Sequence, residues 1–427
     1  MCDTQVLRHQ GVTWFAKNSD REPDEPQLVL RLPPVANDHN TSVRTTYLEI
    51  PQARSRLGVI LSKPAWMWGA EMGVNDHGVA IGNEAIFSRV RSRKPQGLLG
   101  MDLLRLGLER GATAPAAIAV IIEHLERYGQ GGAAGYRDQR FCYDSSFLVC
   151  DADGAWLLET AGRQWALKPA SEMAAISNRL TIGTDYTRHS AGLHEFARKQ
   201  NLWHGHETLH FARTFDSWLL PRFARAEQRE AHSLACLRDT AKAGPTLERL
   251  VQQLRNHAFE ADDFAHASNA DLCMHAANRV RRSQTTGSMV ARMAHSGGGL
   301  DLKILATGAS APCLGLFRPL SFDYETDFSV LAEDHADGRV SPWWHFEPLH
   351  RRALFDPKLR AELRAERDAI EAQLFSQAPT PAHLRTVDQQ CREWDKRNQR
   401  RLGLARQRPA RLTRYWMDVS ARDGIVI

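Results

Sequence analysis

The alternation of hydrophobic and polar positions predicts strands over most of the first 180 residues. Residues 6–8 and 12–16 flank a His9-Gln10-Gly11 turn, which is typical of a β-hairpin. A second hairpin is expected over residues 72–83, with its turn at Asn75-Asp76-His77-Gly78. The same pattern predicts further strands at residues 47–50, 59–61, 147–150, 155–159, 163–168 and 174–176.

Helical spacing interrupts these strands twice, first over residues 98–128 and again over residues 211–256. The first stretch divides into a helix over Leu98–Glu109 and a second helix that Thr113 caps and Gly129 ends. Residues 272–293 and 302–317 predict the last strands. Blocks of strands and blocks of helices do not give the strict alternation of a parallel sheet. We therefore expect antiparallel sheets covered by helices, an α+β layered fold.

The C-terminal part of the chain has a different composition. Residues 347–375 and 381–404 are rich in Arg, Glu, Ala and Leu and predict two helices joined by a proline-containing linker. Residues 345–427 carry 15 Arg and 2 Lys against 11 acidic residues, whereas the whole chain has a net charge of only +5. We expect one domain over residues 1–330 and a basic helical extension over residues 331–427, packed on or next to it.

Composition narrows the class of protein. With 427 residues, 43% of them hydrophobic and 25% charged, the chain is long enough for a large core and is not disordered. No apolar run approaches the length of a membrane span, and the N-terminus lacks a secretory signal pattern. The seven cysteines include no CxxC pair, which favours reduced thiols and a cytoplasmic location without a membrane partner.

Cys2 is the first candidate for chemistry. Removal of Met1 would leave Cys2 with a free α-amine beside its own thiol. An α-amine titrates near ~7.7–8.0, so it can act as a general base for that thiol near neutral pH. This is the logic of an N-terminal nucleophile. A cysteine at position 2 without any function is the alternative reading of the residue alone.

Further residues extend this pattern to a family. Cys2-Asp3-Thr4, followed by Ala16-Lys17-Asn18-Ser19-Asp20-Arg21, resembles the start of the secernin family and its bacterial dipeptidase relatives. The resemblance continues in order at residues 66–85, 98–103, 128–132, 283–290, 307–313, 343–344 and 350–352. It implies a four-layer αββα N-terminal nucleophile hydrolase sandwich, related to penicillin V acylases and bile salt hydrolases. In that group an N-terminal cysteine attacks an amide and forms an acyl-enzyme.

The resemblance also implies roles for individual residues. Cys2 matches the nucleophile, and Asp20 matches the aspartate that contacts its amine. Asn83 and Asn178 match two active-site asparagines that stabilise the oxyanion. Arg222 matches a later catalytic arginine, although Arg225 matches nearly as well and the arginine stays open within residues 222–229.

The substrate pocket has its own candidates. Lys17 stands where the acylases have arginine, which puts the role of this position in doubt, and Asn18 is a candidate for polar contacts. Trp66 and Trp68 would give apolar walls and Glu71 a handle for a substrate amine. Core aromatics and a surface carboxylate are the alternative for these three. Arg225 completes the candidates for substrate binding.

Two further patterns could indicate a metal site or nucleic-acid binding, but neither is favoured. Cys273-Met274-His275 has metal-ligand residue types but no second pair at metal-site spacing, so we expect neither a metal nor another cofactor. The arginines of the extension alternate with acidic residues, which favours a solvated helix or an oligomer contact over nucleic-acid binding.

The sequence therefore predicts a cysteine amidohydrolase, a dipeptidase that acts on a small peptide or acylated amine. A non-hydrolytic regulatory or scaffold protein of the secernin type is the alternative. Self-association through the C-terminal extension is a further expectation.

Overall fold

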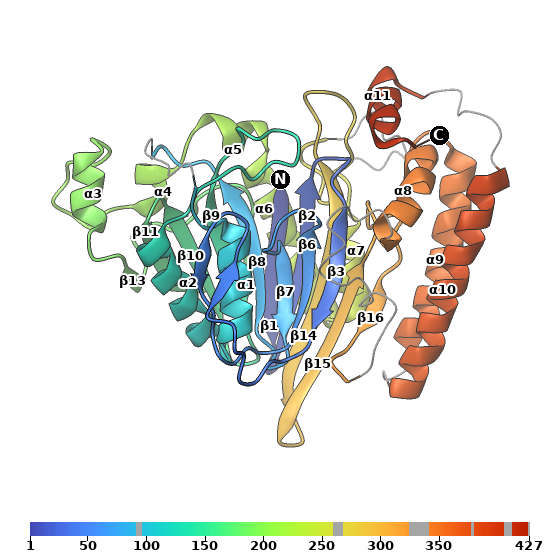
Figure 1. The fold of residues 1–427 in the computed structure, drawn as a ribbon, viewed down its shortest axis with the longest axis horizontal. Coiled ribbons are helices and arrows are strands. Elements are labelled where there is room, and N and C mark those ends of the chain that lie inside the picture. The colour runs from blue at the N-terminus through green and yellow to red at the C-terminus, as the bar shows by residue number, and fades with distance from the viewer. Residues whose placement is uncertain (91–95, 259–267, 324–340, 377–379, 405–411, 426–427) are drawn as a thin grey trace.

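Two antiparallel sheets stacked face to face form the centre of the molecule (Figure 1). The computed structural model describes residues 1–90, 96–258, 268–323, 341–376, 380–404 and 412–425. The first sheet has the strand order β12-β1-β2-β14-β15-β16. Its strands are β1 (Cys2–His9), β2 (Val12–Arg21), β12 (Met173–Ile176), β14 (Gln284–Ser296), β15 (Gly299–Thr307) and β16 (Arg318–Leu320).

The second sheet has eight strands in the order β13-β11-β10-β9-β8-β7-β6-β3. They are β3 (Gln27–Leu32), β6 (Val59–Pro64), β7 (Met72–Asn75), β8 (Ala80–Ile86), β9 (Asp144–Cys150), β10 (Ala155–Ala161), β11 (Gln164–Pro169) and β13 (Arg188–His189). A short separate ribbon consists of β4 (Ser42–Arg44) and β5 (Glu49–Pro51). Apolar side chains that alternate along the strands fill the space between the sheets, among them Val6, Phe15, Val74, Leu148 and Met289.

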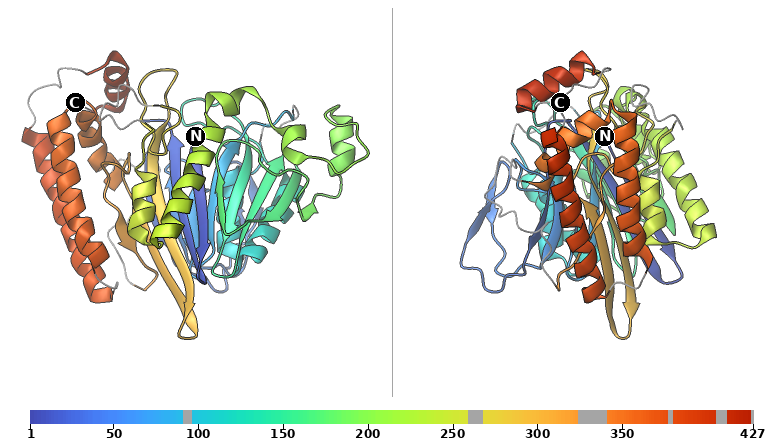
Figure 2. Two further views of the ribbon diagram at one scale, coloured as in Figure 1. Left: turned by 180° about the vertical axis from the view of Figure 1, so that it is seen from behind. Right: turned by 90° about the vertical axis from the view of Figure 1, so that its right-hand side faces the viewer.

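Helices cover both outer faces, as the front and rear views show (Figures 1 and 2). Helices α1 (Gly100–Arg110) and α2 (Ala114–Tyr128) pack on the eight-stranded sheet. Helices α6 (Ala226–Ala243) and α7 (Leu247–Leu254) pack on the six-stranded sheet. The expected four-layer αββα sandwich is therefore confirmed. Three short helices lie in the intervening connections: α3 (Leu193–Lys199), α4 (Phe211–Phe215) and α5 (Leu219–Phe223).

The C-terminal helices lie beside the sandwich, at the edge that β16 forms (Figure 1). They are α8 (Pro342–Ala353), α9 (Pro357–Ser376), α10 (Pro381–Leu404) and α11 (Arg414–Asp423). Phe346, Leu363 and Trp394 share one buried cluster with Leu316 and Phe317 of the sandwich. Among the described residues, no helix combines the length and the apolar character that crossing a membrane requires.

Several expectations about individual elements need correction. The strand predicted over residues 302–317 ends at Thr307, and the helical stretch over residues 211–256 is divided into α4, α5, α6 and α7. The predicted strand over residues 272–293 begins only at Gln284, and residues 269–283 form a loop. The predicted helix over residues 347–375 is divided into α8 and α9, because Asp356 accepts a hydrogen bond from the Leu359 N–H (3.0 Å) and Pro357 lacks an N–H of its own. By contrast, α2 begins and ends as predicted, with the Thr113 hydroxyl accepting from the Ala116 N–H.

Candidate active site

Cys2 begins strand β1, which pairs with β2 on one side and with β12 on the other. Cys2 itself lies opposite Ser19 of β2, whereas the pairing with β12 begins at Thr4, and the Cys2 side chain is buried on the face between the sheets. The Asp20 N–H donates to Sγ at 3.3 Å, and Glu71 Oε2 lies 3.9 Å from Sγ. The thiol thus has one backbone donor and one carboxylate beside it.

The main-chain nitrogen of Cys2 is held separately from the thiol. It donates to Asn178 Oδ1 at 2.9 Å, and Asn178 lies just after β12. Arg229 on α6 donates to the same Oδ1 at 2.7 Å and to the Cys2 carbonyl at 3.0 Å, and it pairs with Asp3 at 2.5 Å. Arg229 is completely buried, and its guanidinium fixes the Cys2 backbone through bonds to three groups: the Cys2 carbonyl, Asp3 and Asn178.

Asp20 lies on β2 next to the N-terminus. The Met1 ammonium donates to its carbonyl oxygen at 2.9 Å, and the Thr285 hydroxyl donates to its Oδ1 at 2.6 Å. Burial raises the pKa of Asp20 to about 6, against the lowering effect of the nearby terminal ammonium. The Asp20 backbone therefore contacts the Met1 ammonium, whereas the main-chain nitrogen of Cys2, the predicted partner of Asp20, donates to Asn178 instead.

The thiol of Cys2 needs a base. Its pKa is raised to about 12, chiefly by burial and also by the Glu84 and Glu71 carboxylates, against the lowering effect of the Lys17 ammonium. At neutral pH the group is therefore a thiol in this environment, and its reactivity depends on a group that can take the proton.

A cavity of about 210 Å³ opens from the Cys2 side chain. Phe87, Phe141 and Tyr143 form an aromatic wall, and these rings lie 5.5–6.3 Å apart between centroids. The charged side chains that line it are four carboxylates and two arginines: Asp20, Glu22, Glu25, Glu71, Arg21 and Arg282. The excess of carboxylates makes the cavity favourable for a positively charged group.

Arg21 organises the acidic side of this cavity. Its guanidinium bonds Glu25 at 2.6 Å, Glu71 at 3.1 Å and the Tyr143 hydroxyl at 3.1 Å. The Trp66 indole donates to Glu25 at 2.8 Å from outside the cavity lining. Glu71 thus lies near the thiol and pairs with Arg21, whereas Trp66 bonds Glu25 and does not itself line the cavity.

Asn83 does not face Cys2. Its neighbours in β8 face the other sheet: a Cβ added to Gly82 would lie 2.6 Å from Thr4, and Glu84 pairs with Lys17. Because side chains alternate along a strand, Asn83 points to the opposite face, toward the first turn of α1. Its Nδ2 lies 2.4 Å from the position that a Cβ on Gly100 would take. This placement disagrees with the expected oxyanion role.

Asn178 reaches Cys2 in an orientation different from the expected one. Its carbonyl oxygen takes the Cys2 N–H, and its Nδ2 donates to the Ala85 carbonyl at 3.0 Å. The amide therefore orients the main-chain nitrogen of Cys2, and its donor group is already engaged.

Lys17 and Asn18 lie on opposite faces of β2. The Lys17 ammonium is fully buried between the sheets, where it bonds the Asn83 carbonyl at 2.8 Å and Glu84 at 2.9 Å. Asn18 bridges the outer face of the sheet to the Leu254 and Leu272 carbonyls. Neither lines the cavity at Cys2, so Lys17 acts on the thiol through its charge and Asn18 ties the sheet to the segments around it.

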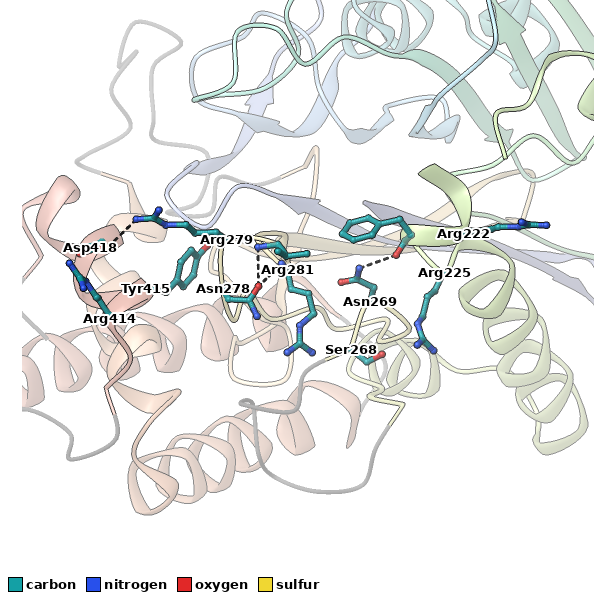
Figure 3. A pocket seen from close by; sticks show the side chains of 12 residues that line it. Arg222, Arg225, Ser268, Asn269, Asn278, Arg279, Arg281, Arg414, Tyr415 and Asp418 are labelled. Atoms are coloured by element: carbon teal, nitrogen blue, oxygen red, sulfur yellow. Dashed lines mark hydrogen bonds and ion pairs between the residues drawn. The ribbon is translucent and has the colours of Figure 1, made fainter. Parts of the chain in front are cut away.

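Arg222, Arg225 and Trp68 lie away from Cys2. Both arginines are exposed and line a separate cavity of about 1070 Å³, which Arg279, Arg281 and Arg414 make strongly basic (Figure 3). The Trp68 ring stacks under the Arg105 guanidinium at 4.1 Å, on the side of α1. The catalytic role expected for Arg222 therefore disagrees with the structure. This residue lies on the short helix α5, its side chain is exposed, and it does not line the cavity at Cys2.

Comparison with known proteins gives remote structural similarities. No protein-family model matches the chain. A conjugated bile acid hydrolase variant from Clostridium perfringens has 10% identity and a TM-score of 0.44, over 78% of this chain and 95% of that chain. Penicillin V acylase from Agrobacterium tumefaciens has 11% identity and a TM-score of 0.43, over 77% and 88%.

A Caenorhabditis elegans orthologue of N-acylethanolamine-hydrolyzing acid amidase has 9% identity and a TM-score of 0.34, over 68% of this chain and 92% of that chain. All three TM-scores are below 0.5. The four-layer arrangement is therefore assigned from the sheets and helices of this chain alone.

The sequence left the arginine open within residues 222–229 without assigning Arg229, and it did not single out Arg21. The stretch of residues 222–229 holds three arginines, and the buried face of α6 singles out Arg229, since Ala226, Arg229 and Ser233 follow one another at helical spacing on that face. Arg21 ends the Asn18-Ser19-Asp20-Arg21 motif but gave no separate signal, because its partners come from distant segments.

Proposed function

We propose that this chain is a cysteine N-terminal nucleophile amidohydrolase, a dipeptidase that forms an acyl-enzyme on Cys2 after removal of Met1. The observation that carries the proposal is the geometry at Cys2. Its main-chain nitrogen lies 2.9 Å from Asn178 Oδ1 and its thiol takes the Asp20 N–H, and both Cys2 and Asn178 line one cavity.

Loss of Met1 would change two things at this site. The main-chain nitrogen of Cys2 would become an α-amine, a base with an ordinary pKa near ~7.7–8.0. Met1 also lines the cavity, so its departure would free room beside the thiol. The same cleavage thus supplies the base that the buried thiol needs and space for a substrate.

The reaction follows from these groups. The α-amine takes the thiol proton as Sγ attacks the scissile carbonyl carbon, and the C–N bond then breaks as the ammonium returns the proton to the leaving amine. A water molecule, deprotonated by the same amine, hydrolyses the thioester and regenerates the thiol. Arg229 and Asn178 hold the amine in place, and the Lys17 charge favours the thiolate.

The cavity favours a small substrate with a free amine. Its volume of about 210 Å³ lies below the ~300–1,000 Å³ of pockets for drug-sized ligands. In an N-terminal residue, the α-ammonium is two bonds from the carbonyl carbon that a nucleophile attacks. Glu71 Oε2, at 3.9 Å from Sγ, lies at a suitable distance for this ammonium. These features favour a dipeptide over a bulky acyl amide.

A dipeptide panel tests the proposal. We expect the wild-type chain without Met1 to release free amino acids, and the Cys2→Ala variant to lose this activity by at least about a thousandfold, as for other removed nucleophiles. Cys236→Ala is the matched control, because this half-buried cysteine lies on α6 and does not line the cavity. Hydrolysis that survives in Cys2→Ala would refute the proposal, and a mature Cys2 that hydrolyses no amide would favour a non-hydrolytic role.

A further inference from the structure

Four side chains with metal-binding atoms lie close together at the loop that precedes β14. His257, Cys273, His275 and Cys313 each offer one atom, and these four atoms lie within 4.8 Å of one another. His257 follows α7, Cys273 and His275 belong to the loop before β14, and Cys313 follows β15. The two cysteines and His275 are buried, and His257 is half-buried.

The distances fit a single tetrahedral ion. Zn–N bonds of ~2.0–2.1 Å and Zn–S bonds of ~2.3 Å place two nitrogen ligands about 3.3 Å apart, and a nitrogen and a sulfur about 3.5 Å apart. The two Nε2 atoms of His257 and His275 are 3.1 Å apart. His275 Nε2 lies 3.7 Å from Cys273 Sγ and 3.4 Å from Cys313 Sγ. Each distance agrees with the tetrahedral value to within a few tenths of an ångström.

We propose that these four residues form a structural zinc site, of the type with two thiolates and two imidazoles. Thiolate and imidazole donors select zinc over hard cations such as magnesium or calcium. Four protein ligands leave no open position for water or substrate, so the ion would hold the fold together and take no part in catalysis.

The site would join segments that support the candidate active site. The Cys273 N–H donates to the Asn256 carbonyl at 3.0 Å, next to His257. The Met274 N–H donates to the Thr285 hydroxyl at 2.8 Å, and that hydroxyl donates to Asp20 at 2.6 Å. An ion at this place would therefore fix the loop that positions Thr285 and, through it, Asp20.

The spacing along the chain hides this site. Only Cys273 and His275 are close in sequence, while His257 and Cys313 reach them from two other segments. A search for paired ligands at zinc-finger spacing therefore does not find it, and only the folded chain brings the four atoms together.

Metal content of the Cys2→Ala protein, purified with a reductant, tests the site independently of the proposed function. We expect about one zinc ion per chain by inductively coupled plasma mass spectrometry. Co²⁺ in its place should give the visible absorption bands of tetrahedral cobalt together with a thiolate charge-transfer band. The double variant Cys273→Ser, Cys313→Ser should lose the ion.

Cys236→Ser is the control for the double variant. Cys236 also lies beside a histidine, with Sγ 3.6 Å from His232 Nε2, but it belongs to no four-ligand group among the described residues. It should keep the zinc. His257→Gln changes the half-buried ligand and should weaken zinc binding at least tenfold in a chain with unchanged circular dichroism. Folded, reduced protein that retains no zinc or cobalt, or a Cys273–Cys313 disulfide that persists with zinc present, would overturn the proposal.

Discussion

Replacing Arg229 by methionine tests how the Cys2 backbone is held. Arg229 is fully buried and bonds the Cys2 carbonyl, the Asp3 carboxylate, Asn178 Oδ1 and the Ala224 carbonyl. The methionine side chain removes all four bonds and leaves the Asp3 carboxylate buried without its cation. Loss of one partner of a buried ion pair reduces the free energy of unfolding by ~3–5 kcal/mol, out of a total of ~5–15 kcal/mol.

A second substitution separates the orphaned charge from the other lost bonds. In Asp3→Asn combined with Arg229→Met, the buried group is neutral, so we expect the double variant to recover about 1–3 kcal/mol relative to Arg229→Met alone. The pH dependence gives a second check. Burial already raises the pKa of Asp3 in the wild type, and loss of Arg229 raises it further, so the deficit of Arg229→Met should grow as pH rises through the raised native pKa of Asp3 in the wild type.

Urea unfolding between pH 4 and pH 8 measures these differences for the wild type, the single variants and the double variant. A double variant that is less stable than Arg229→Met would contradict the role given to the buried Asp3 charge. A deficit of Arg229→Met that is the same at both ends of the pH range would contradict it too.

Three further predictions follow from other sites. Glu71→Gln should lower kcat/KM for dipeptides by about tenfold or more but leave N-acetylated dipeptides nearly unchanged, because only the free α-ammonium loses its carboxylate; equal losses would contradict the role of Glu71. Burial raises the pKa of Glu159 to about 7, so the free energy of unfolding should fall as pH rises from about 4.5 to 7, and Glu159→Gln should flatten this slope. Gly100→Ala should reduce the free energy of unfolding by ~1–3 kcal/mol, because its Cβ would lie 1.9 Å from Ser145 Oγ. Gly107→Ala is the control and should change the free energy of unfolding by less than ~1 kcal/mol, because the nearest atom to its Cβ would lie at 3.1 Å. Similar losses for the two variants in urea unfolding would refute this prediction.

The fold was largely predictable because local patterns and tertiary structure agree. The hairpin that begins at residue 6 is the β1–β2 pair, and the cap at Thr113 begins α2 as predicted. The strand predicted over residues 272–293 was wrong in its first part, residues 272–283, because apolar residues such as Leu272 and Met274 are buried in a loop by contacts from other segments. Periodicity does not distinguish such a loop from a strand.

The site was predictable only where residues that are close in the chain are also close in the fold. Cys2 and Asp20 come together because β1 and β2 form one hairpin. Asn83 was misplaced because a motif gives the position of a residue in the chain but not the face of the strand on which its side chain lies. Arg229 and Arg21 become functional candidates only through contacts with residues 50 or more positions away.

The mass of the N-terminal peptide, from reduced protein purified from its native host, tests the central claim most directly. The account predicts a peptide that begins at Cys2, without Met1 and with an unmodified α-amine and thiol. A peptide that retains Met1, or whose Cys2 amine is blocked, would contradict the account, because the base that the buried thiol requires would then be missing.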